Sequence, residues 1–289
     1  MHTILLTGRN GQVGWELQRS LQGLGRVVAP DSRSLDLADP DALRATIAEV
    51  RPSLIINPAA YTAVDLAEQE VERAYAINGI APGVLAEQAK RLGIPLIHYS
   101  TDYVYSGEGD TPWHEHDPVA PQNVYGASKL AGEEAIRAIG CDHLILRTSW
   151  VYAARGKNFL LTMRRLGRER ESLNIVADQV GAPTWARTIA DLTTHIVAVR
   201  PDWHGVSGVY HLVNGGNTSW FGFAEAIFRL AAAAGDKVPN VAPIASEAYP
   251  TPAKRPKNSR LALNKLQETF GLTPPHWEEA LALCWESLP

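Results

Sequence analysis

Short apolar runs alternate with amphipathic segments along the first half of the chain. The runs predict strands at 2–7, 26–30, 53–60, 95–101 and 143–149, and the segments between them predict helices at 15–24, 39–50, 65–92 and 125–139. Asp39 and Pro40 are suited to open the second of these helices, and Pro82 predicts a kink or break in the third. Regular alternation of strand and helix indicates an α/β fold built on a doubly wound parallel sheet of Rossmann type.

The second half of the chain is less regular. Its patterns predict helices at 158–170, 184–200, 219–234 and 276–287, and strands at 173–177 and 209–213. We therefore expect residues 1–150 to form the Rossmann domain, with later segments near 180–218 returning to it. Residues 151–289 should form mainly a smaller α/β domain that binds the substrate.

Three glycines separate the first strand from the first helix, at Gly8, Gly11 and Gly14. In this position glycines let backbone N–H groups and a helix N-terminus approach a pyrophosphate. The spacing G-x-x-G-x-x-G points to the short-chain dehydrogenase/reductase branch of dinucleotide-binding folds. We assign cofactor binding to the whole loop: Gly8, Arg9, Asn10, Gly11, Gln12, Val13 and Gly14.

The residues after the second strand carry two opposed signals for the cofactor. Asp31 suits the free ribose 2'-hydroxyl of NAD, whereas Arg33 suits the 2'-phosphate of NADP. The sequence leaves this choice open, with NADPH ahead and NADH also plausible. Small residues after the third strand would let a cofactor lie against the strand end, although close packing explains them equally well. The remaining expected cofactor contacts are Asp36, Leu37, Ala59, Ala60 and Tyr61.

Tyr125 and Lys129 stand four apart at the start of a predicted helix, and therefore on one face. A free tyrosine has a pKa of about 10, and a nearby ammonium group lowers it by favouring the phenolate. We expect Tyr125 to exchange a proton with the substrate and Lys129 to lower its pKa, both also contacting the cofactor. Thr101, at the end of the fourth predicted strand, should orient the substrate oxygen.

The composition of the chain limits the kinds of binding partner that we expect. Hydrophobic content of 45%, charged content of 20% and a formal charge of -4 are those of an ordinary globular protein, with no basic excess to attract nucleic acid or an anionic membrane. No apolar run is long enough to span a bilayer, and no signal peptide precedes the first strand, so we expect a cytoplasmic protein. Cys141 and Cys284 lack metal-ligand spacing and should be reduced. No metal site is expected.

Seven stretches of the chain resemble the dTDP-4-dehydrorhamnose reductase family, extended-type members of the short-chain dehydrogenase/reductases. They span nearly the whole chain: TGRNGQVGWEL at 7–17, NPAAYTAVD at 57–65, YSTDYV at 99–104, NVYGASKLAGE at 123–133, RTSWVY at 147–152, DQVGAPT at 178–184 and RPKNS at 255–259. The middle motifs are common among sugar-nucleotide enzymes. Their combination with RTSWVY and DQVGAPT is much more specific.

The resemblance implies reduction by NAD(P)H of the 4-keto group of dTDP-4-dehydro-beta-L-rhamnose, the last step toward dTDP-L-rhamnose. In such an enzyme Tyr125 protonates the emerging alkoxide, Lys129 also binds the nicotinamide ribose, and Thr101 hydrogen-bonds the carbonyl oxygen. Asn158 and Arg255 would lie toward the nucleotide and its phosphates. The substrate-binding residues that it implies are Val64, Asp65, Thr101, Asp102, Tyr103, Trp150, Asn158 and Arg255.

Other functions remain open on the sequence alone. Another nucleotide-sugar reductase or an epimerase or dehydratase of the same fold is one alternative, although Tyr103 after Asp102 suits a reductase better than the acidic pair usual in dehydratases. A non-catalytic regulatory subunit, as in methionine adenosyltransferase, is a second. Some relatives join two subunits through magnesium at a glutamate corresponding to Glu16, but Arg187 stands near the expected acidic partner. A monomer or a homodimer without magnesium is expected.

Overall fold

The computed structural model describes residues 2–199 and 202–288. Its central feature is a six-stranded sheet, whose strands are all parallel and follow the order β10-β5-β4-β3-β1-β2. This confirms the predicted doubly wound α/β fold. The strands are β1 (Thr3–Leu6), β2 (Arg26–Val28), β3 (Leu54–Asn57), β4 (Leu96–Thr101), β5 (His143–Thr148) and β10 (Gly208–His211).

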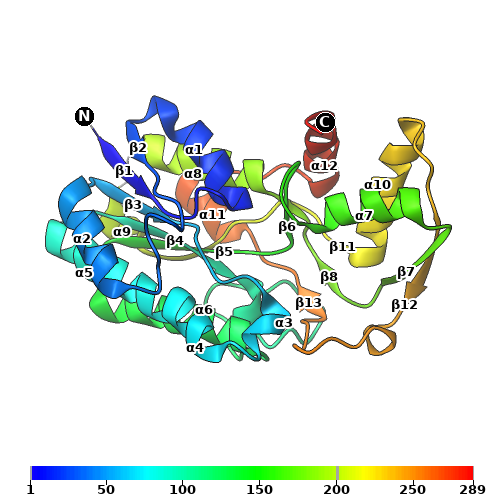
Figure 1. Ribbon diagram of the computed structural model, residues 1–289, viewed down its shortest axis with the longest axis horizontal. Coiled ribbons are helices and arrows are strands. Elements are labelled where there is room, and N and C mark those ends of the chain that lie inside the picture. The colour runs from blue at the N-terminus through cyan, green and yellow to red at the C-terminus, as the bar shows by residue number, and fades with distance from the viewer. Residues whose placement is uncertain (1, 200–201, 289) are drawn as a thin grey trace.

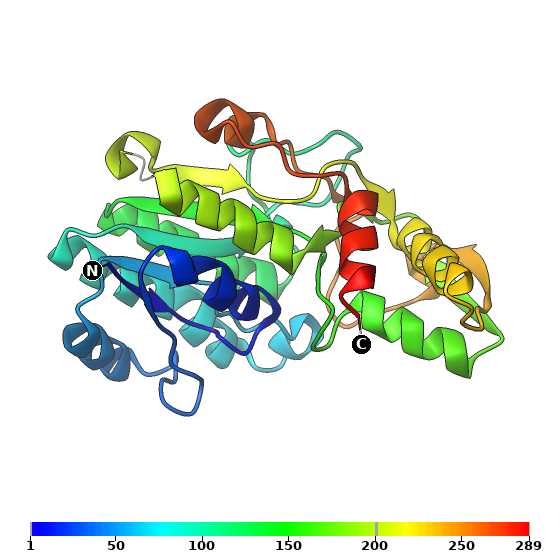
Figure 2. The ribbon, with the colours of Figure 1, turned by 90° about the horizontal axis from the view of Figure 1, so that it is seen from above.

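Helices cover both faces of this sheet (Figures 1 and 2). Successive residues of a strand point to opposite faces, so Ile4 and Leu6 pack in one core and Leu5 in the other. The Ile4 side carries α1 (Gln12–Ser20), α8 (Ala186–Val199) and α11 (Asn264–Phe270); the Leu5 side carries α2 (Pro40–Val50), α5 (Ala81–Leu92) and α6 (Val124–Ile139).

Two of these helices begin where side chains cap them. Asp39 accepts hydrogen bonds from Asp41 N and Ala42 N, and Pro40 is the first residue of α2, as the sequence predicts. Asn123 accepts from Gly126 N at the start of α6, and Glu68 accepts from Val124 N at 2.8 Å. The helix that carries Tyr125 and Lys129 is therefore fixed at its N-terminus from two sides.

The helical segment expected at 65–92, with a kink or break at Pro82, is interrupted before that proline. The segment divides into α3 (Val64–Ala67), α4 (Val71–Tyr75), a π-helical turn (Ala76–Ile80) and α5. Pro82 comes just after the π-helical turn in a backbone that is already helical, so its missing N–H falls where regular α-helical hydrogen bonding is interrupted. The end of α8 expected at Arg200 lies outside the described residues.

A smaller lobe stands beyond the carboxyl ends of the sheet strands, on the right in Figure 1. Its core is aromatic and includes Tyr152, Phe223, Phe228 and Trp277. Its helices are α7 (Phe159–Glu169), α10 (Trp220–Ala233) and α12 (Trp277–Glu286), with the parallel pair β7 (Ser172–Val176) and β12 (Asn240–Ile244). Short strands join it to the sheet: β6 (Val151–Tyr152), β8 (Val180–Gly181), β9 (Thr184–Trp185), β11 (Thr218–Ser219) and β13 (Asn258–Ser259).

The second half of the chain contributes to both lobes. β10 extends the sheet beside β5, and α8 packs against α1, while the short α9 (Trp203–Val206) precedes β10. Among the described residues, no helix combines the length and the apolar character needed to cross a bilayer. Short 3-10 turns complete the described elements: Leu21–Gly23, Asp102–Val104 and Ser246–Ala248.

Candidate functional site

A cleft of about 550 Å³ opens at the carboxyl ends of the sheet strands, where parallel α/β sheets bind their ligands. Most of the predicted cofactor residues line it: Gly8, Arg9, Asn10, Gly11, Gln12, Val13, Gly14, Asp31, Asp36, Leu37, Ala59, Ala60, Tyr125 and Lys129. Arg33 and Tyr61 are not among its lining residues. The Tyr61 hydroxyl instead donates to Glu70 Oε2 at 2.9 Å.

The glycine loop has a backbone shape that side chains would prevent. Gly8 has a φ of +62°, and a Cβ there would lie 2.8 Å from Ala59 Cα. A Cβ on Gly14 would lie 2.1 Å from the Gly8 carbonyl oxygen. Because these contacts are with backbone, only glycine fits, and the first turn of α1 stays open to a pyrophosphate. The residues present therefore fit a dinucleotide.

Asp31 is occupied within its own turn. Its Oδ1 accepts hydrogen bonds from the backbone N–H groups of Arg33 and Ser34, at 3.0 and 3.1 Å. These N–H groups, Ser34 first, lower the pKa of Asp31. Arg9 lines the cleft and donates from Nη1 to the Ala29 carbonyl at 3.1 Å. The arginine at this end of the cleft is therefore Arg9 rather than Arg33.

Lys129 is buried at the inner end of the cleft, with 1% of its surface exposed. Its Nζ donates to the Tyr99 carbonyl at 2.6 Å and lies 3.1 Å from His98 Nε2. Burial lowers the pKa of Lys129 to about 8, against the opposing charge of Glu133. Lys129 can therefore change its charge near neutral pH.

Tyr125 has a raised pKa. Burial raises the pKa of its hydroxyl to about 12, a hydrogen bond with the Thr101 side chain opposes this, and the charge of Asp102 adds to it. The expectation that Lys129 lowers the pKa of Tyr125 is wrong in this arrangement, because the ammonium is directed toward the Tyr99 carbonyl. Tyr125 is thus fully protonated at neutral pH and can act as an acid next to Thr101.

Asp102 and Tyr103 lie beside this pair. Thr101 Oγ1 donates to Asp102 Oδ1 at 3.1 Å, and the Tyr103 ring meets the Tyr125 ring edge-on at a centroid distance of 5.4 Å. Burial raises the pKa of Asp102 to about 6, with the Ser259 hydroxyl and then Thr101 opposing it. The Asp102 Oδ2 atom and Ser259 Oγ are both buried without a hydrogen bond of normal length.

Asp65 and Arg255 join the two lobes. Arg255 Nη2 donates to Asp65 Oδ2 at 2.6 Å, and Asp65 Oδ1 accepts from Ala253 N. Arg255 Nη1 is buried and makes no hydrogen bond within the described residues. Val64 begins α3 immediately before Asp65. The ion pair therefore fixes Arg255 beside α3, with its Nη1 atom enclosed by protein.

Trp150 has an uncommon backbone for a bulky residue, with a φ of +48°. Its ring stacks on Trp220 at a centroid distance of 3.6 Å, and a Cβ on Gly181 would lie 2.9 Å from it. Residues held in such conformations cluster at ligand sites. The stack gives the lobe a flat aromatic wall.

Asn158 makes several hydrogen bonds within the protein, and its substrate role stays a prediction. Its Oδ1 caps α7 by accepting from Leu161 N, and its Nδ2 donates to Gln12 Oε1 and to the Ala153 and Arg155 carbonyls. These contacts occupy the NH₂ group of the amide and one lone pair of its oxygen. Asn158 instead ties the glycine loop to the smaller lobe.

Several residues of the site were not predicted from the sequence. Arg73, Arg155 and Lys157 line the cleft, and basic residues after the RTSWVY motif were a usable signal for the last two. Asn57 and His98 are fully buried polar residues in otherwise apolar strands. That break in the apolar pattern was also visible in the sequence.

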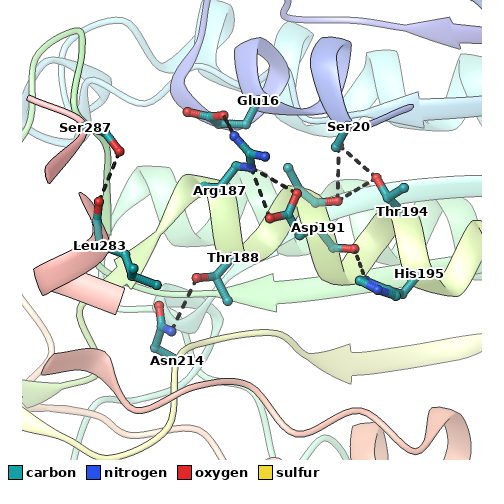
Figure 3. Close-up of polar contacts among 11 residues, drawn as sticks. Glu16, Ser20, Arg187, Thr188, Asp191, Thr194, His195, Asn214, Leu283 and Ser287 are labelled. Carbon is teal, nitrogen blue, oxygen red and sulfur yellow. Dashed lines mark hydrogen bonds and ion pairs between the residues drawn. The ribbon is translucent and has the colours of Figure 1, made fainter. Parts of the chain in front are cut away.

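Glu16 on α1 faces a cation from α8 (Figure 3). Arg187 Nη1 lies 3.9 Å from Glu16 Oε2, and Arg187 also donates to Asp191. Burial raises the pKa of Glu16, and the charge of Arg187 opposes this. Within residues 2–199 and 202–288, no group of three or more His, Cys, Asp or Glu side chains is placed to hold a metal ion.

The parallel sheet, the glycine loop and the Thr101–Tyr125–Lys129 constellation define a short-chain dehydrogenase/reductase. A family model described as the RmlD substrate binding domain matches residues 1–288. The chain belongs to this family, that of the dTDP-4-dehydrorhamnose reductases.

Individual relatives are similar to this chain over nearly their whole length. The chain is 50% identical to a dTDP-4-dehydrorhamnose reductase of Burkholderia thailandensis, covering 99% of this chain and 98% of the relative. It is 48% identical to the Escherichia coli K12 reductase, covering 95% and 94%. The crystal structure of a Bacillus anthracis dTDP-4-dehydrorhamnose reductase in complex with NADP superposes with a TM-score of 0.92, at 38% identity over 99% of both chains.

Proposed function

We propose that this protein uses NADPH to reduce the 4-keto group of dTDP-4-dehydro-beta-L-rhamnose, giving dTDP-L-rhamnose. The observation that carries the proposal is a protonated Tyr125 beside Thr101, at the inner end of a cleft formed by a dinucleotide-binding loop. Relatives named dTDP-4-dehydrorhamnose reductase, at 48 to 50% identity, support the choice of substrate.

The chemistry divides between cofactor and protein. Bound NADPH supplies a hydride to the sugar C4. The Thr101 and Tyr125 hydroxyls hold the carbonyl oxygen, and Tyr125 gives its proton to that oxygen as negative charge develops. The high pKa of Tyr125 keeps the proton available across the neutral range. Lys129, held by the Tyr99 carbonyl, would bind the nicotinamide ribose.

The surrounding side chains are suited to hold a nucleotide sugar. Arg255 offers its unpaired Nη1 to a diphosphate oxygen while Asp65 fixes the other arm of the guanidinium. Trp150, supported by Trp220, provides an aromatic wall for the sugar, and Tyr103 borders Tyr125. Val64 and Asp102 complete this pocket in the proposal.

NADPH is the preferred cofactor in this proposal. The Asp31 carboxylate would repel a 2'-phosphate, but its Oδ1 is held within its own turn by the N–H groups of Arg33 and Ser34. Arg9 lies in the cleft and carries the matching positive charge. NADH should also support turnover, because the rest of the cleft contacts features that the two cofactors share.

Substrate-dependent oxidation of NADPH tests the function. Purified protein should oxidise NADPH in stoichiometric amounts with the dTDP-4-keto sugar, measured at 340 nm as an absorbance loss, and should act less well on other 4-keto nucleotide sugars. An epimerase or dehydratase would convert sugar without net oxidation. A regulatory subunit would bind NADPH and oxidise none with any member of the panel. A cytoplasmic location and a monomeric or homodimeric state stay predictions.

A further inference from the structure

Asn57 and His98 place two polar side chains inside the apolar sheet. They are register partners on β3 and β4, and each is 0% exposed. Thr7, which follows β1, is also buried. Burying polar groups costs free energy unless they are paired, so their hydrogen bonds should explain their presence.

These side chains form a continuous series that ends at Lys129. Thr7 Oγ1 lies 2.6 Å from Asn57 Oδ1, and Asn57 Nδ2 lies 3.0 Å from His98 Nδ1. His98 Nε2 then lies 3.1 Å from Lys129 Nζ. The series therefore connects the residue before Gly8 with the lysine at the base of the cleft.

Each contact from Lys129 to Thr7 can be given one donor and one acceptor. Burial and the charge of Lys129 hold the pKa of His98 well below its usual value, so its ring is neutral, with one donor and one acceptor. If Lys129 donates to Nε2, then Nδ1 carries the proton and must donate to Asn57. A half-turn of the Asn57 amide, whose O and N positions are an assignment, presents its oxygen to His98 and its NH₂ to Thr7.

We propose that His98 is a positioning residue, which together with Asn57 and Thr7 holds the Lys129 side chain in place from within the sheet and favours its ammonium form. Lys129 would otherwise have the Tyr99 carbonyl as its one described hydrogen-bond partner. With His98 it has two acceptors that fix its direction. The catalytic consequence rests on the proposed function, whereas the effect on Lys129 does not.

Other charged or titratable groups also face Lys129, and their effects on its pKa must be separated from the effect of His98. Glu133, one turn further along α6, acts on its charge, and Tyr125 lies one turn before it. Glu133 is itself paired with Arg147 of β5 at 2.6 Å. Substitutions at His98 leave this pair in place, so a change at Lys129 can be assigned to the lost imidazole.

His98→Leu tests the proposal by removing the acceptor. The pKa of Lys129 would be followed by NMR of ¹³C-labelled lysine, with its signal identified by its loss in Lys129→Met. We expect the pKa to fall by about 1 to 2 in His98→Leu, the equivalent of one charge-assisted hydrogen bond. NADPH affinity should decline as Lys129 loses its proton, so the midpoint of this decline should lie at a lower pH in His98→Leu than in the wild type. His98→Gln, which keeps an acceptor, should restore part of both.

His143→Leu is the matched control. His143 is another buried histidine, at the opposite end of β5 from the cleft, and its Nδ1 contacts the Cys141 carbonyl. This variant should leave the pKa of Lys129 unchanged. If His98→Leu does not fold, Thr7→Val removes the far end of the series and should shift Lys129 in the same direction by less.

An unchanged pKa of Lys129 and an unchanged pH dependence of NADPH binding in folded His98→Leu would overturn the proposal, leaving His98 a residue of the core. If His98→Leu does not fold, the same two unchanged results in folded Thr7→Val would overturn the proposal. Both measurements need cofactor and no substrate. Failure of the reductase function would instead appear as normal NADPH binding without oxidation by any 4-keto sugar.

Discussion

Replacing Tyr125 by phenylalanine removes the proposed proton donor and very little else. The ring can keep its edge-on contact with Tyr103, whose centroid lies 5.4 Å away. The lost hydroxyl forms a hydrogen bond with Thr101, worth about 1 kcal/mol. The free energy of unfolding should therefore change by no more than about 1 kcal/mol, and NADPH affinity should be nearly unchanged.

The loss of rate should be much larger. With its pKa near 12, Tyr125 carries its proton in almost every molecule at pH 7.5, so the whole enzyme population loses its acid in Tyr125→Phe. A positioned acid contributes about 10² to 10⁴ in rate, which corresponds to a barrier higher by about 3 to 5 kcal/mol. Steady-state oxidation of NADPH, with cofactor titrated by fluorescence, measures both quantities.

Tyr152→Phe is the matched control for this experiment. Tyr152 is fully buried in the smaller lobe, and its hydroxyl makes no hydrogen bond among the described residues. Removing that hydroxyl should leave turnover unchanged. If Tyr125→Phe folds, binds NADPH and turns over within about fivefold of wild type, another group supplies the proton and the mechanism is refuted.

Three further outcomes follow from charges in the structure. Arg147→Met leaves the buried Glu133 carboxylate without its partner, so unfolding in urea should show a loss of about 3 to 5 kcal/mol, and a stable variant would contradict this. Arg9→Gln should raise the KM for NADPH about tenfold and that for NADH less than twofold; equal effects would show that Arg9 does not contact the 2'-phosphate. Folding raises the pKa of Asp102 from 3.8 to about 6, so protonated Asp102 contributes its full stability below about pH 4, and this contribution is lost as the pH rises through 6. Asp102→Asn should therefore be more stable than the wild type by up to about 3 kcal/mol at pH 7.5 and equally stable near pH 4.

Local pattern was enough to predict the sheet and the cofactor loop. Apolar runs fall on β1, β3, β4 and β5, because parallel strands are buried on both faces and their sequences show it. The glycines at Gly8 and Gly14 were informative for a similar reason, since backbone clashes exclude every other residue there. Such constraints act within a few residues of the chain.

Prediction is limited where distant segments compete for one side chain. Asn158 has a polar amide at a position suited to ligand binding, but its hydrogen bonds go to Gln12, to the backbone before α7 and to the first turn of α7. Asp31 shows a local counterpart: the sequence offered it and Arg33 as opposed signals for the cofactor, and the structure adds that its own turn occupies Oδ1. Sequence shows which groups a residue offers. Only the fold shows which of them are already taken.

The pKa of Tyr125 illustrates the same limit and changes the view of the mechanism. Spacing correctly placed Tyr125 and Lys129 on one face of α6, yet the Tyr99 carbonyl and His98 draw the ammonium toward the sheet. The tyrosine is therefore a retained acid, and Lys129 is the group whose charge changes near pH 8. If so, loss of NADPH affinity on raising the pH reports Lys129, and Tyr125→Phe should leave that pH dependence where it is in the wild type.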